Sequence, residues 1–177
     1  AYHAQYGLQG RCVGCPTLYG HGDDFSPDGH GVAGLMRRLY EAKQHGFKAV
    51  HPWGTGEARR QVLYVDDLAE AAIRIAEAPW FPTVMPLLNV AGEGALSLAG
   101  LAHVIADVVG YQGEICWTGA GSEGALTKAL ASTLPALFTP TPLDQGLGRT
   151  YDWFLANAAH LPGGADSVSA QRAVKED

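Results

Sequence analysis

The sequence predicts an α/β fold, because short apolar runs alternate with longer amphipathic segments along most of the chain. The runs "QVLYV" (61–65) and "PLLNVAG" (86–92) have the length and apolar content of buried strands. The segment 32–45 instead repeats its apolar residues at helical spacing. With 47% hydrophobic and 17% charged residues, the 177-residue chain can bury the core of one domain, or of a large piece of one.

The first elements are expected before residue 46. "RCVGCPTLYG" (11–20) is an apolar run that ends in Pro and Gly, which predicts a buried strand entering a loop. "HGDDFSPDGHG" (21–31) has the composition of a loop throughout. "VAGLMRRLYEAKQH" (32–45) then predicts an amphipathic helix.

The next helix is expected over 68–78, "LAEAAIRIAEA", directly after the strand at 61–65. Asp67 and Glu70 stand three residues apart, as in a capping box. Asp66 and Asp67 are therefore interpreted mainly as a helix cap.

The later elements follow from similar signals. Ser97 is placed to cap a helix over 98–111, and "GEICWTG" (113–119) predicts another strand. Thr141, followed by Pro142, opens a last helix. We expect residues 1–162 to form one folded unit and the small, polar residues 163–177 to be a flexible tail.

Composition and charge exclude several classes of protein. A net charge of −6 and a pI near 5.6 argue against a nucleic-acid groove, which needs clustered Lys and Arg. The apolar runs are too short to span a membrane. Three cysteines do not suggest a disulfide framework, so we expect a reducing, cytoplasmic setting. No signal peptide is visible, and because the chain begins with Ala1 rather than Met, we expect residues upstream of it.

Two motifs invite a functional interpretation that their context does not favour. "GAGSEG" (119–124) matches G-x-G-x-x-G between a predicted strand and "ALTKALAS", which has the composition of a helix. The prolines that follow make the required second strand improbable, so a mobile loop is the better interpretation. Cys12 and Cys15 have C-x-x-C spacing, but they lie along an apolar strand and lack enough further ligands for zinc. Buried small side chains are the preferred account, with zinc and redox roles left open.

Several segments together resemble the C-terminal half of the GDP-L-fucose synthase family, a branch of the extended short-chain dehydrogenase/reductases. The resemblance covers roughly residues 2–160. It rests on "PTLYG", "DDF", "HGVAGLMRRLYEAK", "WGTGEARRQVLYVDDLAEA", "NVAGEGALSLAGLAHVIADVVGYQGEI" and "TYDWFLAN". It implies the C-terminal part of a Rossmann-type fold with a small substrate-binding lobe.

The resemblance also implies a nucleotide-sugar site. Arg60 holds the position at which the family contacts the diphosphate, Trp53 lines the same pocket, and Arg38 lies near the substrate. A guanidinium suits this role because its fixed fork of donors matches phosphate oxygens and stays charged. The alternative is that Arg38 and Arg60 are solvated surface charges.

The chemistry that the family performs implies a role for His30. The family epimerises GDP-4-keto-6-deoxy-mannose at C3 and C5 and then reduces the C4 ketone with NADPH. His30 occupies the family's acid–base His position, and an imidazole titrates near neutrality. The alternative is an exposed loop histidine.

The remaining implied residues depart from the family pattern. Lys128 aligns with a substrate-loop lysine, but its loop, "SEGALTK", lacks the family's prolines and arginine. Pro16, Thr17 and Leu18 correspond to a cofactor-contacting segment that usually has an extra Asn after the Thr.

The sequence also lacks part of the family's machinery. No tyrosine is followed four residues later by lysine, so the ketone-reducing pair is absent, and the acid–base Cys belongs to the missing half. We therefore expect NADP to be bound mainly by an N-terminal half, in the same or another chain, and the complete protein to be an oligomer. The alternative function is a pseudoenzyme or structural subunit that kept the fold for assembly or nucleotide-sugar binding.

Overall fold

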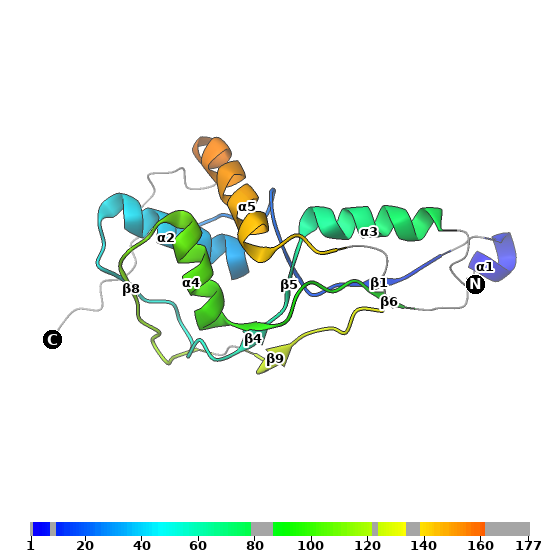
Figure 1. The fold of residues 1–177 in the computed structure, drawn as a ribbon, viewed down its shortest axis with the longest axis horizontal. Helices are drawn as coiled ribbons and strands as arrows, with labels where there is room; N and C mark the ends of the chain where they lie inside the picture. The colour runs from blue at the N-terminus through cyan, green and yellow to red at the C-terminus, as the bar shows by residue number, and fades with distance from the viewer. Residues whose placement is uncertain (1, 8–9, 79–86, 122–123, 134–138, 162–177) are drawn as a thin grey trace.

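The computed structural model describes residues 2–7, 10–78, 87–121, 124–133 and 139–161. Helices and short strands alternate through these residues, which confirms the α/β fold (Figure 1). The helices are α1 (Tyr2–Tyr6), α2 (Gly31–His45), α3 (Val65–Glu77), α4 (Leu98–Val109) and α5 (Leu143–Asn157), followed by a 3-10 turn, η1 (Ala158–His160). The strands are β1 (Val13–Gly14), β2 (Thr17–Tyr19), β3 (Ala49–Val50), β4 (Arg59–Arg60), β5 (Val62–Tyr64), β6 (Leu88–Asn89), β7 (Leu96–Ser97), β8 (Glu114–Ile115) and β9 (Thr127–Lys128).

The strand pairs join segments that are distant in the chain. Strands β1 and β6, β2 and β5, and β3 and β8 pair in parallel. Strand β4 lies between β7, which is antiparallel to it, and β9, which is parallel. Parallel strands need a crossover connection, and here α2 lies on the crossover from β2 to β5, and both α2 and α3 lie on the one from β1 to β6.

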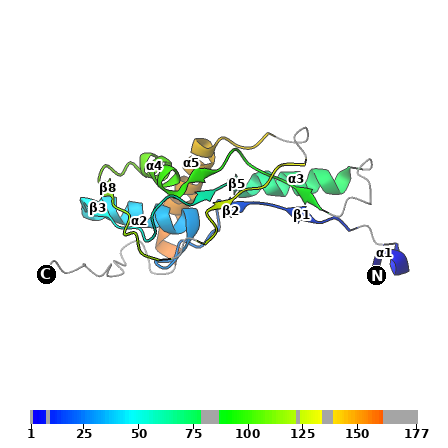
Figure 2. The same cartoon turned by 90° about the horizontal axis from the view of Figure 1, so that it is seen from below.

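The molecule is elongated, with its helices distributed between two regions. Figures 1 and 2 agree that α2, α4 and α5 gather at one end, whereas α3 lies beside β1 and α1 is at the far end. We call the assembly of α2, α4 and α5 the helical lobe. We call β1, β6 and α3 the strand arm.

The helical lobe has an aromatic core. Phe154 of α5 stacks on Phe25 with ring centroids 5.0 Å apart and meets the ring edge of Tyr40 at 5.1 Å. Helices α2 and α4 add aliphatic side chains to the same core, including Met36, Leu39 and Ile105, all buried. Lys43 of α2 links this helix to the end of α4, because its ammonium group donates a hydrogen bond to the carbonyl of Val109, the last residue of α4.

The strand arm has a smaller core under one face of α3. Ala71 and Ile75 of the helix pack against Leu88 of β6, and Leu63 and Val90 complete the cluster. Arg11, just before β1, donates hydrogen bonds to the carbonyls of Ile75 and Ala78 at the end of α3, the second at 3.1 Å. The opposite face of the helix leaves Ile73 58% exposed.

The expected helix starts are partly confirmed. Ser97 caps α4 as predicted, because its Oγ accepts the N–H of Gly100 at 3.0 Å. The capping box at Asp67 is wrong. Helix α3 begins at Val65, its N-cap residue Tyr64 makes no side-chain cap bond, and Asp67 lies inside the first turn.

Two segments differ from interpretations that the sequence allowed. Residues 127–128 form strand β9 beside β4, where the sequence was compatible with a helix. Cys12 is exposed rather than buried, and Cys15 is half-buried, so their interpretation as core side chains is wrong for Cys12. All three cysteines are free thiols. The proposed tail, 163–177, and part of the loop at 119–124 lie outside the described residues.

Candidate functional site

The helical lobe borders a cavity of about 430 Å³ that brings together most of the predicted site residues. We call it the cationic pocket. It is lined by Thr17, His30, Gly31, Val32, Leu35, Arg38, Pro52, Trp53, Arg60, Val62, Leu98, Leu101, Trp117 and Lys128. Among the described residues that line it, three carry a full positive charge and none is acidic.

His30 and Trp53 meet at this pocket from different segments. His30 is the residue before α2, with extended backbone, and its side chain is exposed. Its ring lies edge-on to the indole of Trp53, with centroids 6.2 Å apart. The imidazole is therefore accessible to a ligand and has an aromatic neighbour that limits its orientations.

Arg37 and Arg38 are adjacent in α2 but have different environments. Arg37 is buried and donates to the Phe25 carbonyl and to Glu41, each at 2.7 Å. Arg38 is half-buried, lines the cationic pocket and donates to the Gly29 carbonyl at 2.9 Å. Successive helical residues point about 100° apart, which separates the two roles.

The charge of Arg38 is held in a partly desolvated position. Burial lowers the pKa of its guanidinium, and the carboxylates of Asp28 and Glu41 partly offset that effect. An arginine nevertheless stays protonated at any physiological pH. A charge shielded from water interacts more strongly with a bound anion than an exposed one does.

Arg60 and Lys128 lie directly opposite each other on the parallel strands β4 and β9. The Arg60 guanidinium donates to the Ala125 carbonyl at 2.9 Å, which holds it beside the segment that carries Lys128. Like charges on directly opposed strand residues destabilise a sheet. An anion bound between them would relieve that repulsion, so the pair favours a phosphate or carboxylate ligand.

The predicted cofactor segment is divided by the structure. Thr17 lines the cationic pocket, and Pro16 and Thr17 line a neighbouring hollow that also includes Lys128. Leu18 instead packs against the core of the strand arm. Successive side chains along a strand point to opposite faces, which explains why Thr17 and Leu18 of β2 lie on different sides.

Sequence reasoning missed the apolar wall of the pocket. Trp117 follows β8, and Leu98 and Leu101 belong to the first turns of α4. Each was expected only as part of a strand or a helix. A prediction of strand or helix does not say which cavity a side chain will face, so nothing in the sequence indicated that these three residues line the pocket.

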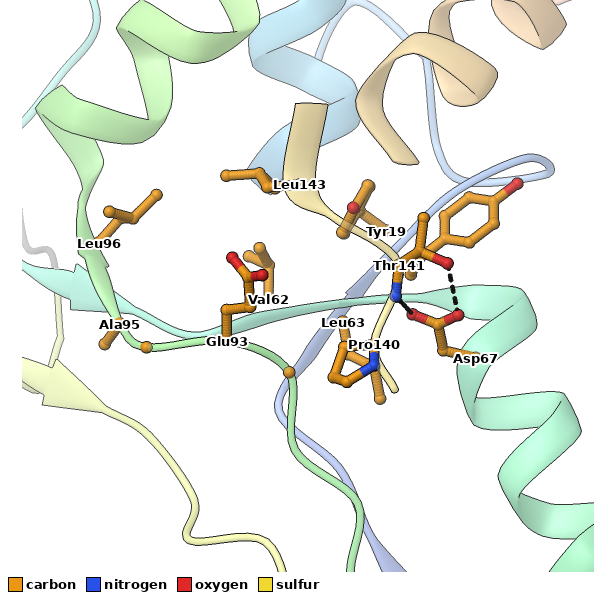
Figure 3. Close-up of a pocket in the computed structure, with 13 residues that line it drawn as sticks. Tyr19, Val62, Leu63, Asp67, Glu93, Ala95, Leu96, Pro140, Thr141 and Leu143 are labelled. Atoms are coloured by element: carbon orange, nitrogen blue, oxygen red, sulfur yellow. Dashed lines mark hydrogen bonds between the residues drawn. The ribbon is translucent and has the colours of Figure 1, made fainter. Parts of the chain in front are cut away.

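A second cavity, of about 240 Å³, lies beside the start of α5 (Figure 3). None of the predicted site residues lines it. Burial, together with Asp67 nearby, raises the pKa of Tyr19, which stands at its wall. The phenol therefore stays protonated at neutral pH and is a poor candidate for a general base.

The same cavity shows what Asp67 does. Its carboxylate accepts hydrogen bonds from the backbone N–H of Thr141 at 2.8 Å and from the Thr141 hydroxyl at 2.7 Å (Figure 3). Asp67 is buried and belongs to α3, whereas Thr141 lies just before α5. The residue predicted to cap its own helix thus links the strand arm to the helical lobe.

Two features are absent from the residues that the structure describes. Within those ranges no cluster of three His, Cys, Asp or Glu side chains is arranged to hold a metal ion. Over the same part of the chain, no helix combines the length and apolar character needed to cross a membrane.

Residues 1–91 match the family model described as NAD dependent epimerase/dehydratase family. GDP-L-fucose synthase 1 of Arabidopsis thaliana is 35% identical over 165 residues, which cover 90% of this chain and 50% of the plant protein. GDP-L-fucose synthase of Escherichia coli (strain K12) is 35% identical over 173 residues, 92% of this chain and 54% of the bacterial protein. The chain thus spans about half the length of these relatives.

Solved structures show the same relation. A GDP-L-fucose synthetase from Naegleria fowleri bound to NADP is 26% identical, with a TM-score of 0.71 over 83% of this chain and 47% of that protein. A UDP-glucose 4-epimerase from Thermotoga maritima, solved with UDP-glucose, has a TM-score of 0.73 at 21% identity over 88% of this chain and 49% of that one. The second likeness concerns the fold alone.

Proposed function

Because this chain belongs to the NAD dependent epimerase/dehydratase family, we propose that it is the C-terminal, nucleotide-sugar-binding half of an enzyme of the GDP-L-fucose synthase type. One observation carries the proposal. Arg38, Arg60 and Lys128 come from three separate elements and line a single cavity in which no described lining residue is acidic. A diphosphate is the ligand group that such a cluster suits best.

The proposed reaction is the conversion of GDP-4-keto-6-deoxy-mannose to GDP-L-fucose, and His30 is the acid–base group that this chain contributes. Protons beside the C4 ketone are acidified because the resulting enolate delocalises its charge, so an imidazole can exchange them at C3 and C5. The exposure of His30 at the cationic pocket supports this role. Reduction of the ketone needs a hydride, which NADPH supplies when it is bound.

The proposal needs further protein for the rest of the chemistry. Pro16 and Thr17 line open hollows and Leu18 does not, so the described residues offer only a small part of a dinucleotide site. We place most of the NADP site and the Tyr–Lys pair in a complementary N-terminal half, in the same or another chain. The outer edge of β1 suits such a partner, because among the described strands β1 pairs only with β6. We place the assembly, an oligomer, in the reducing cytoplasm, which the free thiols fit.

Titration of the chain with GDP tests the binding site. Arg60→Ala removes a charge-assisted contact, which costs about 1.5–3 kcal/mol, or roughly 10- to 150-fold in affinity. Arg59→Ala is the matched control, because Arg59 precedes it on β4, donates to the Ala95 carbonyl at 2.6 Å and lies outside the pocket. Equal affinity in both variants and the unchanged protein would mean that Arg60 is a surface charge.

Proton exchange tests the role of His30 separately. In protein completed by its N-terminal half, His30→Ala should keep GDP affinity but slow deuterium incorporation at C3 and C5 by about 10²- to 10⁴-fold. The signal is read by NMR of the nucleotide sugar. Unchanged exchange would assign the acid–base step to other residues.

A non-catalytic subunit is the second candidate. The lack of the Asn expected after Thr17 and the altered loop that carries Lys128 favour it. The coding sequence upstream of Ala1 distinguishes the two candidates. A glycine-rich strand and a Tyr-x-x-x-Lys pair encoded there would support the enzyme, and their absence would support the subunit.

A further inference from the structure

Trp117 occupies a position that its role in the core does not fully explain. Its indole is half-buried and packs against the core of the helical lobe, and it also lines the cationic pocket. The other tryptophan of this pocket, Trp53, is 50% exposed and lies outside that core. The indole of Trp117 is thus supported by the core of the lobe, and the indole of Trp53 is exposed to solvent.

The two tryptophans are held by a reciprocal arrangement with glycines. A Cβ added to Gly56 would come within 2.6 Å of the Trp117 ring, and a Cβ added to Gly121 within 3.1 Å of the Trp53 ring. Each indole therefore lies close against a glycine of the segment that carries the other indole. A side chain at either glycine would displace the ring that it touches.

Backbone hydrogen bonds hold these two segments in register. The N–H of Thr118 donates to the Pro52 carbonyl at 3.0 Å, and the N–H of Gly119 donates to the Gly54 carbonyl at 2.8 Å. In return, the N–H of Gly54 donates to the Ala120 carbonyl at 2.6 Å. The backbone segments that carry the two indoles are consequently fixed relative to each other, and a preorganised site loses less entropy on binding.

We propose that Trp117, together with Trp53, forms the surface on which the nucleobase of the bound nucleotide sugar stacks, an inference that rests on the proposed function. A nucleoside diphosphate presents a flat base at one end and negative charge at the other. The cationic pocket offers two indoles and three cations, in a volume within the range of small-molecule sites, about 300–1,000 Å³. Stacking on an aromatic side chain needs only a π face, and Trp provides the largest one.

Two ligands separate base recognition from phosphate recognition. GDP carries a base and a diphosphate, and inorganic pyrophosphate carries only the phosphates, so each is titrated calorimetrically into the 177-residue chain. Trp117→Leu keeps an apolar side chain against the core but removes the π face. It should weaken GDP binding by about 5- to 150-fold while pyrophosphate binding is unchanged. Trp117→Phe should recover much of the GDP affinity.

The other outcomes identify which statement fails. GDP affinity unchanged in Trp117→Leu would overturn the inference and leave Trp117 as a packing residue. Equal losses for GDP and pyrophosphate would also overturn it, because the substitution would then act through the shape of the whole pocket. If the unsubstituted chain bound neither ligand, the proposed function would fail and the inference with it.

Discussion

The helical lobe and the strand arm are built from the same chain but differ in how completely they bury their apolar surface. Among the described residues, the core of the lobe includes 18 buried side chains, and the core of the arm includes five. Helices α2, α4 and α5 all contribute side chains to the core of the lobe, whereas α3 packs against β6, whose only partner among the described strands is β1. Among these residues, the apolar core of the lobe is therefore larger than that of the arm.

The cationic pocket lies beside the helical lobe and not beside the strand arm. His30, just before α2, and Arg38, in the middle of α2, line the cationic pocket from the lobe, and Arg60 and Lys128 line it from strands beside the lobe. No residue of β1, β6 or α3 lines that pocket. The pocket is therefore built without any residue of the strand arm.

The largest expected effect compares one core residue from each region. Phe154→Ala should lower the free energy of unfolding by about 3–5 kcal/mol, because the ring is buried between Phe25 and Tyr40. Ile75→Ala should cost about 2 kcal/mol, because the thin arm can collapse around the deleted atoms. Urea unfolding followed by circular dichroism measures both. Equal losses would mean that the arm is as well packed as the lobe.

An intermediate effect is expected at the link between the two regions. Asp67→Ala removes a buried carboxylate that accepts two hydrogen bonds from Thr141, so stability should fall by about 1.5–3 kcal/mol. Asp66→Ala is the control, because its pair with His21 is exposed and should be worth about 0–1 kcal/mol. The melting temperature reports both changes. Similar values for the two variants would show that the Thr141 contact does not stabilise the fold.

The smallest effect concerns the loop before α2. Burial raises the pKa of Asp23, so the folded chain holds this proton more tightly than the unfolded chain, in which the pKa is about 3.9. Stability therefore falls as the pH rises from that value through the raised one, and it stays lower at neutral pH. Asp23→Asn removes the charge and keeps an oxygen for the Asp24 N–H, which Asp23 accepts at 2.8 Å.

The outcome for Asp23 is read from melting temperatures at two pH values. At pH 7 the Asp23→Asn chain should melt slightly above the unsubstituted chain, and the difference should disappear below about pH 4, where both side chains are neutral. A constant difference at both pH values would indicate a packing effect rather than a titration.

Residue patterns predicted the parts of the fold that depend on neighbours in the chain. The apolar spacing of α2 and the cap at Ser97 were both predicted correctly, because helical periodicity and N-caps are local properties. The same local logic failed at Asp67. A carboxylate beside a helix start can cap that helix or bond elsewhere, and a residue distant in the chain, Thr141, decided between them.

The sequence by itself determined the α/β class, the main helices and, through its resemblance to a family, the residues to examine for a diphosphate. Only the tertiary structure decided which of those residues meet. Arg60 and Lys128 lie opposite each other because β4 and β9 pair across a long stretch of chain, a register that no local pattern encodes. Strand pairing and packing likewise decided that Trp117 lines the pocket and that Leu18 packs against the core of the strand arm. Which face a side chain presents depends on what its strand pairs with and packs against.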